Sequence, residues 1–251
     1  MFGALLTTYS ETSNYIGGMG MFYGIDYYYI VLVLPAVLIA MFAQFKVKSA
    51  YNKYSKIGNS RGITGAQAAR MILDSHGLQY VQITMISGQL TDNFNPKTNV
   101  VSLSQGVYNG TSIASIGIAA HEVGHAIQHS ENYVPNKIRS ALVPVTNFGS
   151  SISIFMIIIG LLLGYSVLAY LGVILYSTAA LFQLVTLPVE FNASSRAMKQ
   201  IKALGIANDA DAKGVKKVLS AAAMTYVAAL LTSIAQLVRL LLIVNRRSNR
   251  D

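Results

Sequence analysis

The 251-residue chain contains no cysteine and unusually few charged residues. Without cysteine it cannot form a disulfide framework, a Cys-based zinc site or a thiol nucleophile. Charged residues make up 12% of the chain and hydrophobic residues 53%. Because a soluble domain usually has about 25% charged residues, this composition is typical of a membrane protein.

The positive net charge of +9 does not indicate a nucleic-acid partner. Basic residues flank the long apolar runs, for example at 46–61 and 246–250, as the positive-inside rule expects of a membrane protein. They are not interleaved with aromatic residues as they are in RNA-binding segments. We therefore expect the lipid bilayer, and no nucleic acid, among the partners of the chain.

The first apolar run predicts a transmembrane helix over residues 27–45. This run is uncharged and 19 residues long, which is just enough to cross the hydrocarbon core of a bilayer as a helix. Residues 1–45 hold no Lys or Arg, whereas the next stretch is rich in both. Residues 1–26 are therefore expected to be an extracytoplasmic lead-in. They lack the basic start of a cleavable signal peptide.

Residues 46–145 are predicted to form a small cytoplasmic α+β domain. Thr64 is placed to cap a first helix. Short strands are expected at Val81–Ile86 and Val100–Leu103, with turn-forming residues between them. A further helix is expected to begin after residues 109–112, where Asn, Gly, Thr and Ser follow one another.

A second apolar stretch predicts a transmembrane helical hairpin over residues 146–187. Fifty consecutive residues in this part of the chain carry no formal charge, and at about 1.5 Å of rise each they could cross two bilayer cores. Residues 164–166 have the composition of a tight turn. Two crossings return the chain to the side from which it left. Residues 188–218, with breaks at Gly205 and Gly214, are therefore expected in the cytoplasm as a helical segment.

The final segment, residues 219–251, predicts a membrane-associated helix with a basic tail. Its apolar part, Leu219–Val244, has the length of a span, but Arg239 would then lie in hydrocarbon, where a charge costs several kcal/mol. A span would also place Arg246 and Arg247 outside, against the positive-inside rule. The sequence leaves the topology of this helix open.

The stretch His121-Glu122-Val123-Gly124-His125 indicates metal chemistry. On a helix, residues four positions apart share a face, so both imidazoles can reach one zinc ion. Glu122 would then stand beside a water on that zinc and could act as its general base. The motif therefore predicts a zinc-dependent peptidase.

A catalytic zinc usually takes three protein ligands and leaves one position for water. His129 is excluded as the third ligand, because it lies about 12 Å from His121 along the helix axis. Glu122 is the base of the motif, and Glu131 is too close in sequence, on or just beyond the same helix. On the expected cytoplasmic side the remaining acidic residues are then Asp74, Asp92, Glu190, Asp209, Asp211 and Asp251. Glu190 is favoured among them, because the hairpin returns the chain to the side of His121 just before it.

These residues make the chain resemble the integral-membrane gluzincin peptidases, and most closely the YugP-type neutral zinc metallopeptidase family. The likeness rests on His121-Glu122-x-x-His125, a hydrophobic hairpin and Glu190-Phe191-x-Ala193, and it extends over most of the chain. It implies a mainly α-helical membrane protein with a small, gluzincin-like α+β catalytic domain. It also implies Zn²⁺ held by His121, His125 and Glu190, with Glu122 as the catalytic base.

One position departs from the related HtpX-type membrane peptidases. There, the fourth residue after the glutamate ligand is Asp, whereas here it is Ser194. A serine can contact a ligand histidine only as a neutral partner. The electrostatic tuning of His121 by a second carboxylate is therefore in doubt.

The expected activity is hydrolysis of peptide bonds at the cytoplasmic face of the cell membrane, in membrane or membrane-proximal polypeptides. An extended substrate could pair with an edge strand near Val100–Ser104. Arg196 is a candidate oxyanion partner, but a lipid headgroup or an acidic residue could equally be what it binds. Partner membrane proteins and a homo-oligomer both stay open.

Two other classes of function compete with a protease. A membrane-embedded scaffold or chaperone could carry a structural or vestigial zinc site, and it would need no general base at Glu122. A transporter or channel would need polar side chains in the middle of its spans, and the hairpin at 146–187 offers few beyond Ser, Thr, Tyr and Gln183.

Overall fold

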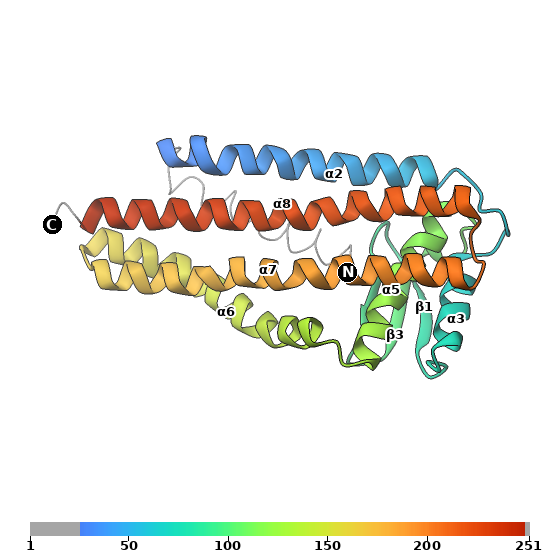
Figure 1. The fold of residues 1–251 in the computed structure, drawn as a ribbon. Coiled ribbons are helices and arrows are strands. Elements are labelled where there is room, and N and C mark those ends of the chain that lie inside the picture. Colours follow the sequence, from blue (N-terminus) through green and yellow to red (C-terminus); the bar gives the residue numbers. More distant parts are fainter. Residues whose placement is uncertain (1–25, 249–251) are drawn as a thin grey trace. The chain divides into compact units, whose positions relative to one another are not determined.

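The computed structural model describes residues 26–248, so nearly all of the expected lead-in at 1–26 lies outside the described residues. The elements, in chain order, are a π-helical turn η1 (Tyr29–Val33), α2 (Leu34–Tyr54), α3 (Gly65–Ser75), β1 (Gln82–Ile86), β2 (Asn93–Asn95), β3 (Val100–Ser104), α4 (Gln105–Tyr108), α5 (Ile113–Ser130), α6 (Val134–Leu163), α7 (Ser166–Ala203) and α8 (Asp209–Ser248) (Figure 1). Long helices and one small sheet confirm the predicted fold class.

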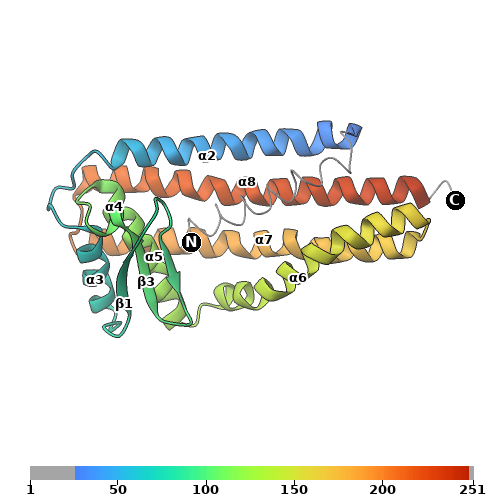
Figure 2. The same cartoon turned by 180° about the vertical axis from the view of Figure 1, so that it is seen from behind.

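The chain divides into two compact units. Of the described residues, 44–133 and 190–223 form the first, which we call the motif unit, and 26–43, 134–189 and 224–248 form the second, the helical unit. Because α2, α7 and α8 each contribute residues to both units, the division does not follow the sequence order. The sheet, α3 and α5 belong entirely to the motif unit (Figure 2).

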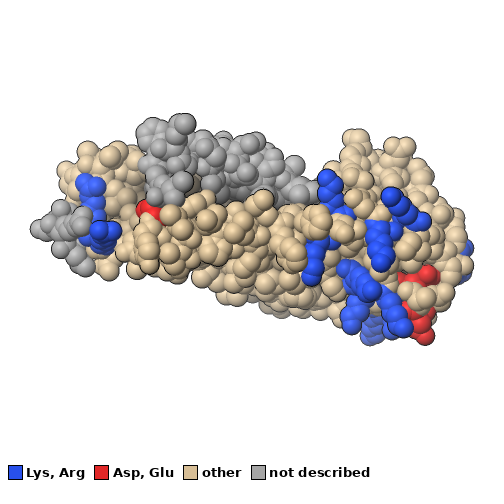
Figure 3. Space-filling view, turned by 90° about the horizontal axis from the view of Figure 1, so that it is seen from above, with Lys and Arg blue, Asp and Glu red and all other residues tan. Residues whose placement is uncertain are grey.

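Within residues 26–248, four helices are long and apolar enough to cross a membrane: Tyr29–Tyr54, Val134–Leu163, Ser166–Ala203 and Asp209–Arg247. The turn predicted at residues 164–166 is confirmed, because α6 ends at Leu163 and Gly164 adopts a φ of 74°. Figure 3 shows one face of the molecule, on which Lys and Arg side chains gather over the motif unit and again near the C-terminal end of α8. Most of the remaining surface in that view carries no charge.

One of the two breaks expected after the hairpin was wrong. Helix α7 runs without interruption from the predicted hairpin through Pro188 to Ala203. The predicted break at Gly205 is confirmed by its φ of 59°, whereas Gly214 lies inside α8. A Cβ at Gly214 would stand 2.9 Å from the ring of Tyr54, so this glycine serves close packing rather than a turn.

Helix α8 packs antiparallel to α2. In the helical unit, the hydroxyl of Thr232 donates to the carbonyl of Ala36 at 3.5 Å, and Arg239 reaches Asp26, which lies just before η1 and α2. In the motif unit, Val47 near the other end of α2 packs with residues 221–222 of α8. Small side chains along such a helix pair allow close approach of the backbones.

The charge of Arg239 is balanced within the helical unit. Its side chain is 4% exposed, its Nε donates to Asp26 Oδ2 at 2.9 Å, and its guanidinium lies 5.2 Å from the centre of the Tyr29 ring. A paired and stacked guanidinium costs far less to bury than an isolated charge. The main physical objection to α8 as a membrane span therefore falls away.

The sheet of the motif unit has the order β1-β3-β2, with β1 parallel and β2 antiparallel to β3. The expectation that Val100–Ser104 forms an edge was wrong, because β3 is the central strand. The three-residue strand β2 was not predicted. It precedes a turn and pairs Phe94 with Val101. Helix α5 contacts both β2 and β3, and α3 contacts β1.

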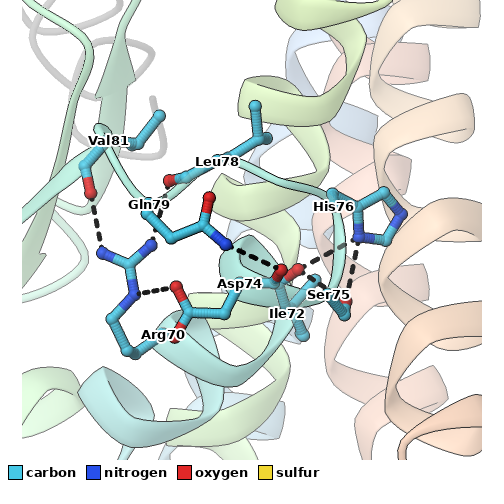
Figure 4. A network of polar contacts seen from close by, with 8 residues as sticks. All are labelled: Arg70, Ile72, Asp74, Ser75, His76, Leu78, Gln79 and Val81. Carbon is cyan, nitrogen blue, oxygen red and sulfur yellow. Dashed lines mark hydrogen bonds and ion pairs between the residues drawn. The ribbon is translucent and has the colours of Figure 1, made fainter.

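Helix α3 begins and ends at local signals. Thr64 accepts a hydrogen bond from the Gln67 backbone N–H, and the Gln67 side chain accepts one from the Thr64 N–H, so the predicted cap is a complete capping box. The guanidinium of Arg70, a residue of α3, donates to the carbonyl oxygens of Leu78 and Val81, which lie between α3 and β1 (Figure 4). This anchors the connection to β1.

A buried carboxyl lies where the sheet meets the helices. Asp92 is 0% exposed and accepts hydrogen bonds from the backbone N–H and the hydroxyl of Ser104, at 2.7 and 3.1 Å. Burial raises the pKa of Asp92 to about 6, and the negative charge of Glu122 adds to the rise while the Ser104 bonds oppose it. The carboxyl of Asp92 thus holds the end of β3 in place. The free energy that its burial costs depends on pH, because the ionised form is the one that burial disfavours.

We expect Asp92→Asn to flatten the pH dependence of stability. The ordinary pKa of the group is 3.8, against about 6 in the folded chain. Between these values the folded state binds the extra proton, so folding weakens as pH rises through this window, by up to about 3 kcal/mol. Thermal unfolding in detergent between pH 4 and pH 7 measures this. The exposed Asp74→Asn is the control, and an unchanged slope in Asp92→Asn would contradict the assignment.

A second prediction concerns the pair in the helical unit. Asp26→Arg and Arg239→Asp should each destabilise the detergent-solubilised chain, and the double exchange should recover much of the loss. Removing one partner of a fully buried pair costs about 3–5 kcal/mol. The cost should be smaller here, because the Asp26 side chain is 31% exposed. Asp74→Asn is the control, because it breaks the partly exposed pair with Arg70 but leaves the Arg70 hydrogen bonds to Leu78 and Val81 in place, and its expected effect is below about 1 kcal/mol. Strictly additive losses in the double exchange would refute the pairing.

Candidate metal centre

The His-Glu motif lies on a helix that is buried on every side. All residues from Ile113 to Gln128 of α5 are buried. The helix begins where predicted, because the Ser112 side chain accepts a hydrogen bond from the Ser115 N–H. One core encloses α5, built from side chains of α3, the sheet, the end of α7 and the start of α8. A surface helix with stray histidines is therefore excluded.

Helix α7 crosses α5 at very short range. A Cβ at Gly124 would stand 2.6 Å from the carbonyl oxygen of Ala193, which is too close for any side chain to fit without moving the backbone. Only glycine at position 124 lets the two backbones approach this closely. The crossing brings Glu190, which lies three residues before Ala193, over the face of α5 that carries both histidines.

Three donor atoms converge at this crossing. Glu190 Oε2 lies 3.3 Å from His121 Nε2 and 3.5 Å from His125 Nε2. All three ligand atoms lie within 4.8 Å of one another, and all three residues are buried. Tetrahedral zinc with bonds of about 2.0–2.1 Å separates its ligand atoms by about 3.3–3.4 Å. The two short separations match this spacing, so the donor set fits zinc.

Glu122 lies beside these atoms and is 0% exposed. Among residues 26–248, neither oxygen of its carboxylate has a hydrogen-bond partner. A buried carboxylate without a donor is costly and is rarely kept for stability alone. Its position next to His121 on α5 makes Glu122 a candidate for proton transfer at this site.

The outer nitrogens of both rings have neutral partners. His121 Nδ1 lies 3.1 Å from Ser194 Oγ, and His125 Nδ1 lies 3.0 Å from Gln128 Oε1. Both rings therefore turn their Nε2 atoms toward Glu190. Ser194, the departure noted in the sequence, contacts His121 as the neutral partner that was expected.

The other residues considered as metal ligands in the sequence have different partners in the structure. His129 lies at the end of α5, with its ring 5.9 Å from that of Phe94. Asp74 pairs with Arg70, and Asp211 accepts from the backbone N–H of Ser60 at 2.8 Å. Within the described part of the chain, His121, His125 and Glu190 form the single group that could hold a metal. Asp251 lies outside the described residues.

Two polar residues of the site were missed in the sequence. Gln128 donates from Nε2 to Asn192 Oδ1 at 2.9 Å, and so links α5 to α7. Asn192 also accepts from Arg196 Nε at 2.7 Å, and Arg196 pairs with Glu131. The helical spacing could have pointed to Gln128, which lies three residues after His125. Of the three partners considered for Arg196, the acidic residue is the one observed.

Comparison with known proteins agrees with this geometry. The family model described as "Putative neutral zinc metallopeptidase" matches residues 29–245. The chain is similar to the "Putative membrane protease YugP" of Bacillus subtilis (strain 168), with 49% identity over 215 residues that cover 86% of this chain and 96% of the relative. No solved structure matches the chain. Because the match spans both the buried donor set and the four candidate membrane helices, the chain belongs to the putative neutral zinc metallopeptidase family.

Proposed function

We propose that this chain is an integral-membrane zinc metalloendopeptidase with His121, His125 and Glu190 as metal ligands and Glu122 as the catalytic base. The observation that carries the proposal is the convergence of three buried donor atoms at zinc spacing beside a buried carboxylate. Two imidazoles and one carboxylate are a donor set of catalytic zinc, which leaves a fourth position for water or substrate.

The donor set also favours catalysis over a structural site. Structural zinc is almost always held by four protein ligands, most often with cysteine among them. This chain has no cysteine, and the described residues offer three donors. The scaffold alternative would further leave Glu122 buried without a role, although burying a carboxylate lowers stability.

Glu122 is the residue of the chain that moves the proton. Zinc, when bound, lowers the pKa of water toward neutrality and polarises a carbonyl group. Glu122 accepts the proton of the attacking water and then gives it to the nitrogen of the leaving amine. Because Glu122 and the ligand His121 are adjacent on one helix, their relative position is fixed by the rigid backbone of α5.

The substrate is a polypeptide that adds to the edge of the sheet. The edges are β1 and β2, and β2 packs against helix α5, which carries both histidines. Backbone groups of Asn93–Asn95 could pair with an extended chain by β-addition. Arg196 is no longer a candidate oxyanion partner, because it is engaged by Glu131 and Asn192.

The site faces the cytoplasm in this proposal. Residues 1–45 carry no Lys or Arg, and Lys46, Lys48, Lys53 and Lys56 follow at once. By the positive-inside rule, the N-terminal end of α2 is then outside and the motif unit is cytoplasmic. The hairpin α6–α7 and the span α8 follow as further crossings, and substrates are membrane or membrane-proximal proteins.

Replacing the base should abolish proteolysis without removing the metal. Glu122→Gln keeps the shape of the side chain but cannot accept the proton, so kcat should fall by at least about 10²-fold. Cleavage of casein by the detergent-solubilised full chain measures activity, and elemental analysis of the same sample measures zinc. Wild-type cleavage that survives a chelator, or an active Glu122→Gln, would refute the mechanism. Full zinc with no activity would support it.

Replacing the third ligand should release zinc. Glu190→Ala leaves two imidazoles, which cannot hold the ion at the affinity of three donors. Zinc per chain after dialysis against a weak chelator should fall well below that of the wild type. Asp74→Asn, at an exposed carboxylate, is the matched control and should retain the metal. Full retention in Glu190→Ala would remove this residue from the ligand set.

A further inference from the structure

We propose that Arg196 sets the direction of a chain of hydrogen bonds that keeps His125 in the tautomer able to bind a metal through Nε2. Arg196, Asn192 and Gln128 are then positioning residues for the metal site. The inference rests on the proposed function, because it assumes that His125 is a ligand. It adds residues whose roles lie outside the ligand set and the base.

The chain of contacts runs from the surface to the metal site. Arg196 Nε donates to Asn192 Oδ1 at 2.7 Å. Gln128 Nε2 donates to the same oxygen at 2.9 Å. Gln128 Oε1 lies 3.0 Å from His125 Nδ1. Each of these contacts is of normal hydrogen-bond length, so the series is continuous from α7 to α5.

Arg196, at the outer end of this series of hydrogen bonds, fixes which group donates and which accepts in each of them. A guanidinium has N–H donors and no acceptor. The atom of Asn192 that faces Arg196 must therefore be its oxygen, since the amide nitrogen would place two donors against each other. The same oxygen faces Gln128, so the atom that Gln128 presents to it must be the nitrogen.

The direction then passes to the histidine. With its nitrogen turned to Asn192, Gln128 turns its oxygen to His125. An oxygen of this kind only accepts, so His125 Nδ1 must carry the hydrogen. A neutral imidazole has one N–H, and Nε2 is then left with its lone pair. Nε2 is the atom that lies 3.5 Å from Glu190 Oε2, where the metal would bind.

The other histidine has no such constraint from its partner. His121 Nδ1 contacts the hydroxyl of Ser194, and a hydroxyl can either donate or accept. This contact alone is compatible with both tautomers of His121. The two histidines are therefore held by different means. Only for His125 does the series of hydrogen bonds from Arg196 determine which ring nitrogen carries the hydrogen.

Arg196 is itself held from two sides. Its Nη1 lies 2.6 Å from Glu131 Oε2, just beyond the end of α5. Its guanidinium also lies 5.9 Å from the centre of the Tyr133 ring. The Arg196 side chain is 23% exposed and that of Glu131 is 50% exposed. Because exposed ion pairs are worth little, Glu131 should matter less than the direction that Arg196 imposes.

The test compares variants that keep the donor and acceptor roles along this series of hydrogen bonds with variants that lose them. Arg196→Gln can present either an oxygen or a nitrogen to Asn192, so the direction is no longer imposed. Arg196→Lys still only donates, and Asn192→Asp still only accepts. Asn192→Leu breaks the chain at another residue, and Glu131→Gln removes the ion pair but leaves Arg196 in place. All are made in the full chain in detergent.

Two measurements are made on each variant. The first is zinc affinity by chelator competition, in which loss of an outer hydrogen-bond partner typically costs about 10–100-fold. The second is the ¹⁵N spectrum of the histidine-labelled, zinc-free chain at alkaline pH, which distinguishes the Nδ1–H from the Nε2–H tautomer. Neither measurement depends on proteolysis, so this test can fail while the proposed peptidase activity stands.

We expect Arg196→Gln and Asn192→Leu to lose about tenfold or more in zinc affinity and to show a mixture of tautomers at His125. Arg196→Lys, Asn192→Asp and Glu131→Gln should stay near the wild-type affinity and keep Nδ1–H. Equal losses in Arg196→Gln and Arg196→Lys would overturn the proposal, and so would an unchanged His125 signal in Arg196→Gln. If Arg196→Gln does not fold, the pair Asn192→Leu and Asn192→Asp decides in the same way.

Discussion

The close crossing of α5 and α7 is the constraint on which the candidate site depends. At Gly124 the backbone of α7 lies where a side chain would otherwise be. This contact fixes how far Glu190 can be from the two histidines, and it brings Ser194 to His121 and Asn192 to Gln128. A single methyl group at position 124 would push the two helices apart and disturb all of these contacts together.

Buried polar groups are handled differently in the two units. In the helical unit, the one buried arginine is matched by Asp26, so the charge is neutralised locally. In the motif unit, Asp92 and Glu122 are both carboxyls in the core, and the negative charge of Glu122 raises the cost of ionising Asp92. A fold that keeps two such groups close together gives up stability, and catalysis is a reason to do so.

Local chemistry made much of this fold predictable. The caps at Thr64 and Ser112 and the turn after Leu163 follow from residues within four positions of one another. Glu190 emerged as a candidate because counting membrane crossings placed it on the right side. The strand β2 was missed because three residues beside a turn carry too little pattern, and the continuation of α7 past Pro188 depends on packing. Gln128 and Asn192 were missed because amides acquire a role only through their three-dimensional neighbours.

The donors of the candidate centre come from parts of the chain that are synthesised at different times. His121 and His125 are made before the hairpin α6–α7, and Glu190 lies in α7, its second helix. The three donors can meet only after both helices of the hairpin have been made and folded back. A growing chain therefore holds an incomplete site through most of its insertion into the membrane. A protease of this design would stay inactive toward neighbouring nascent proteins until its own assembly was finished.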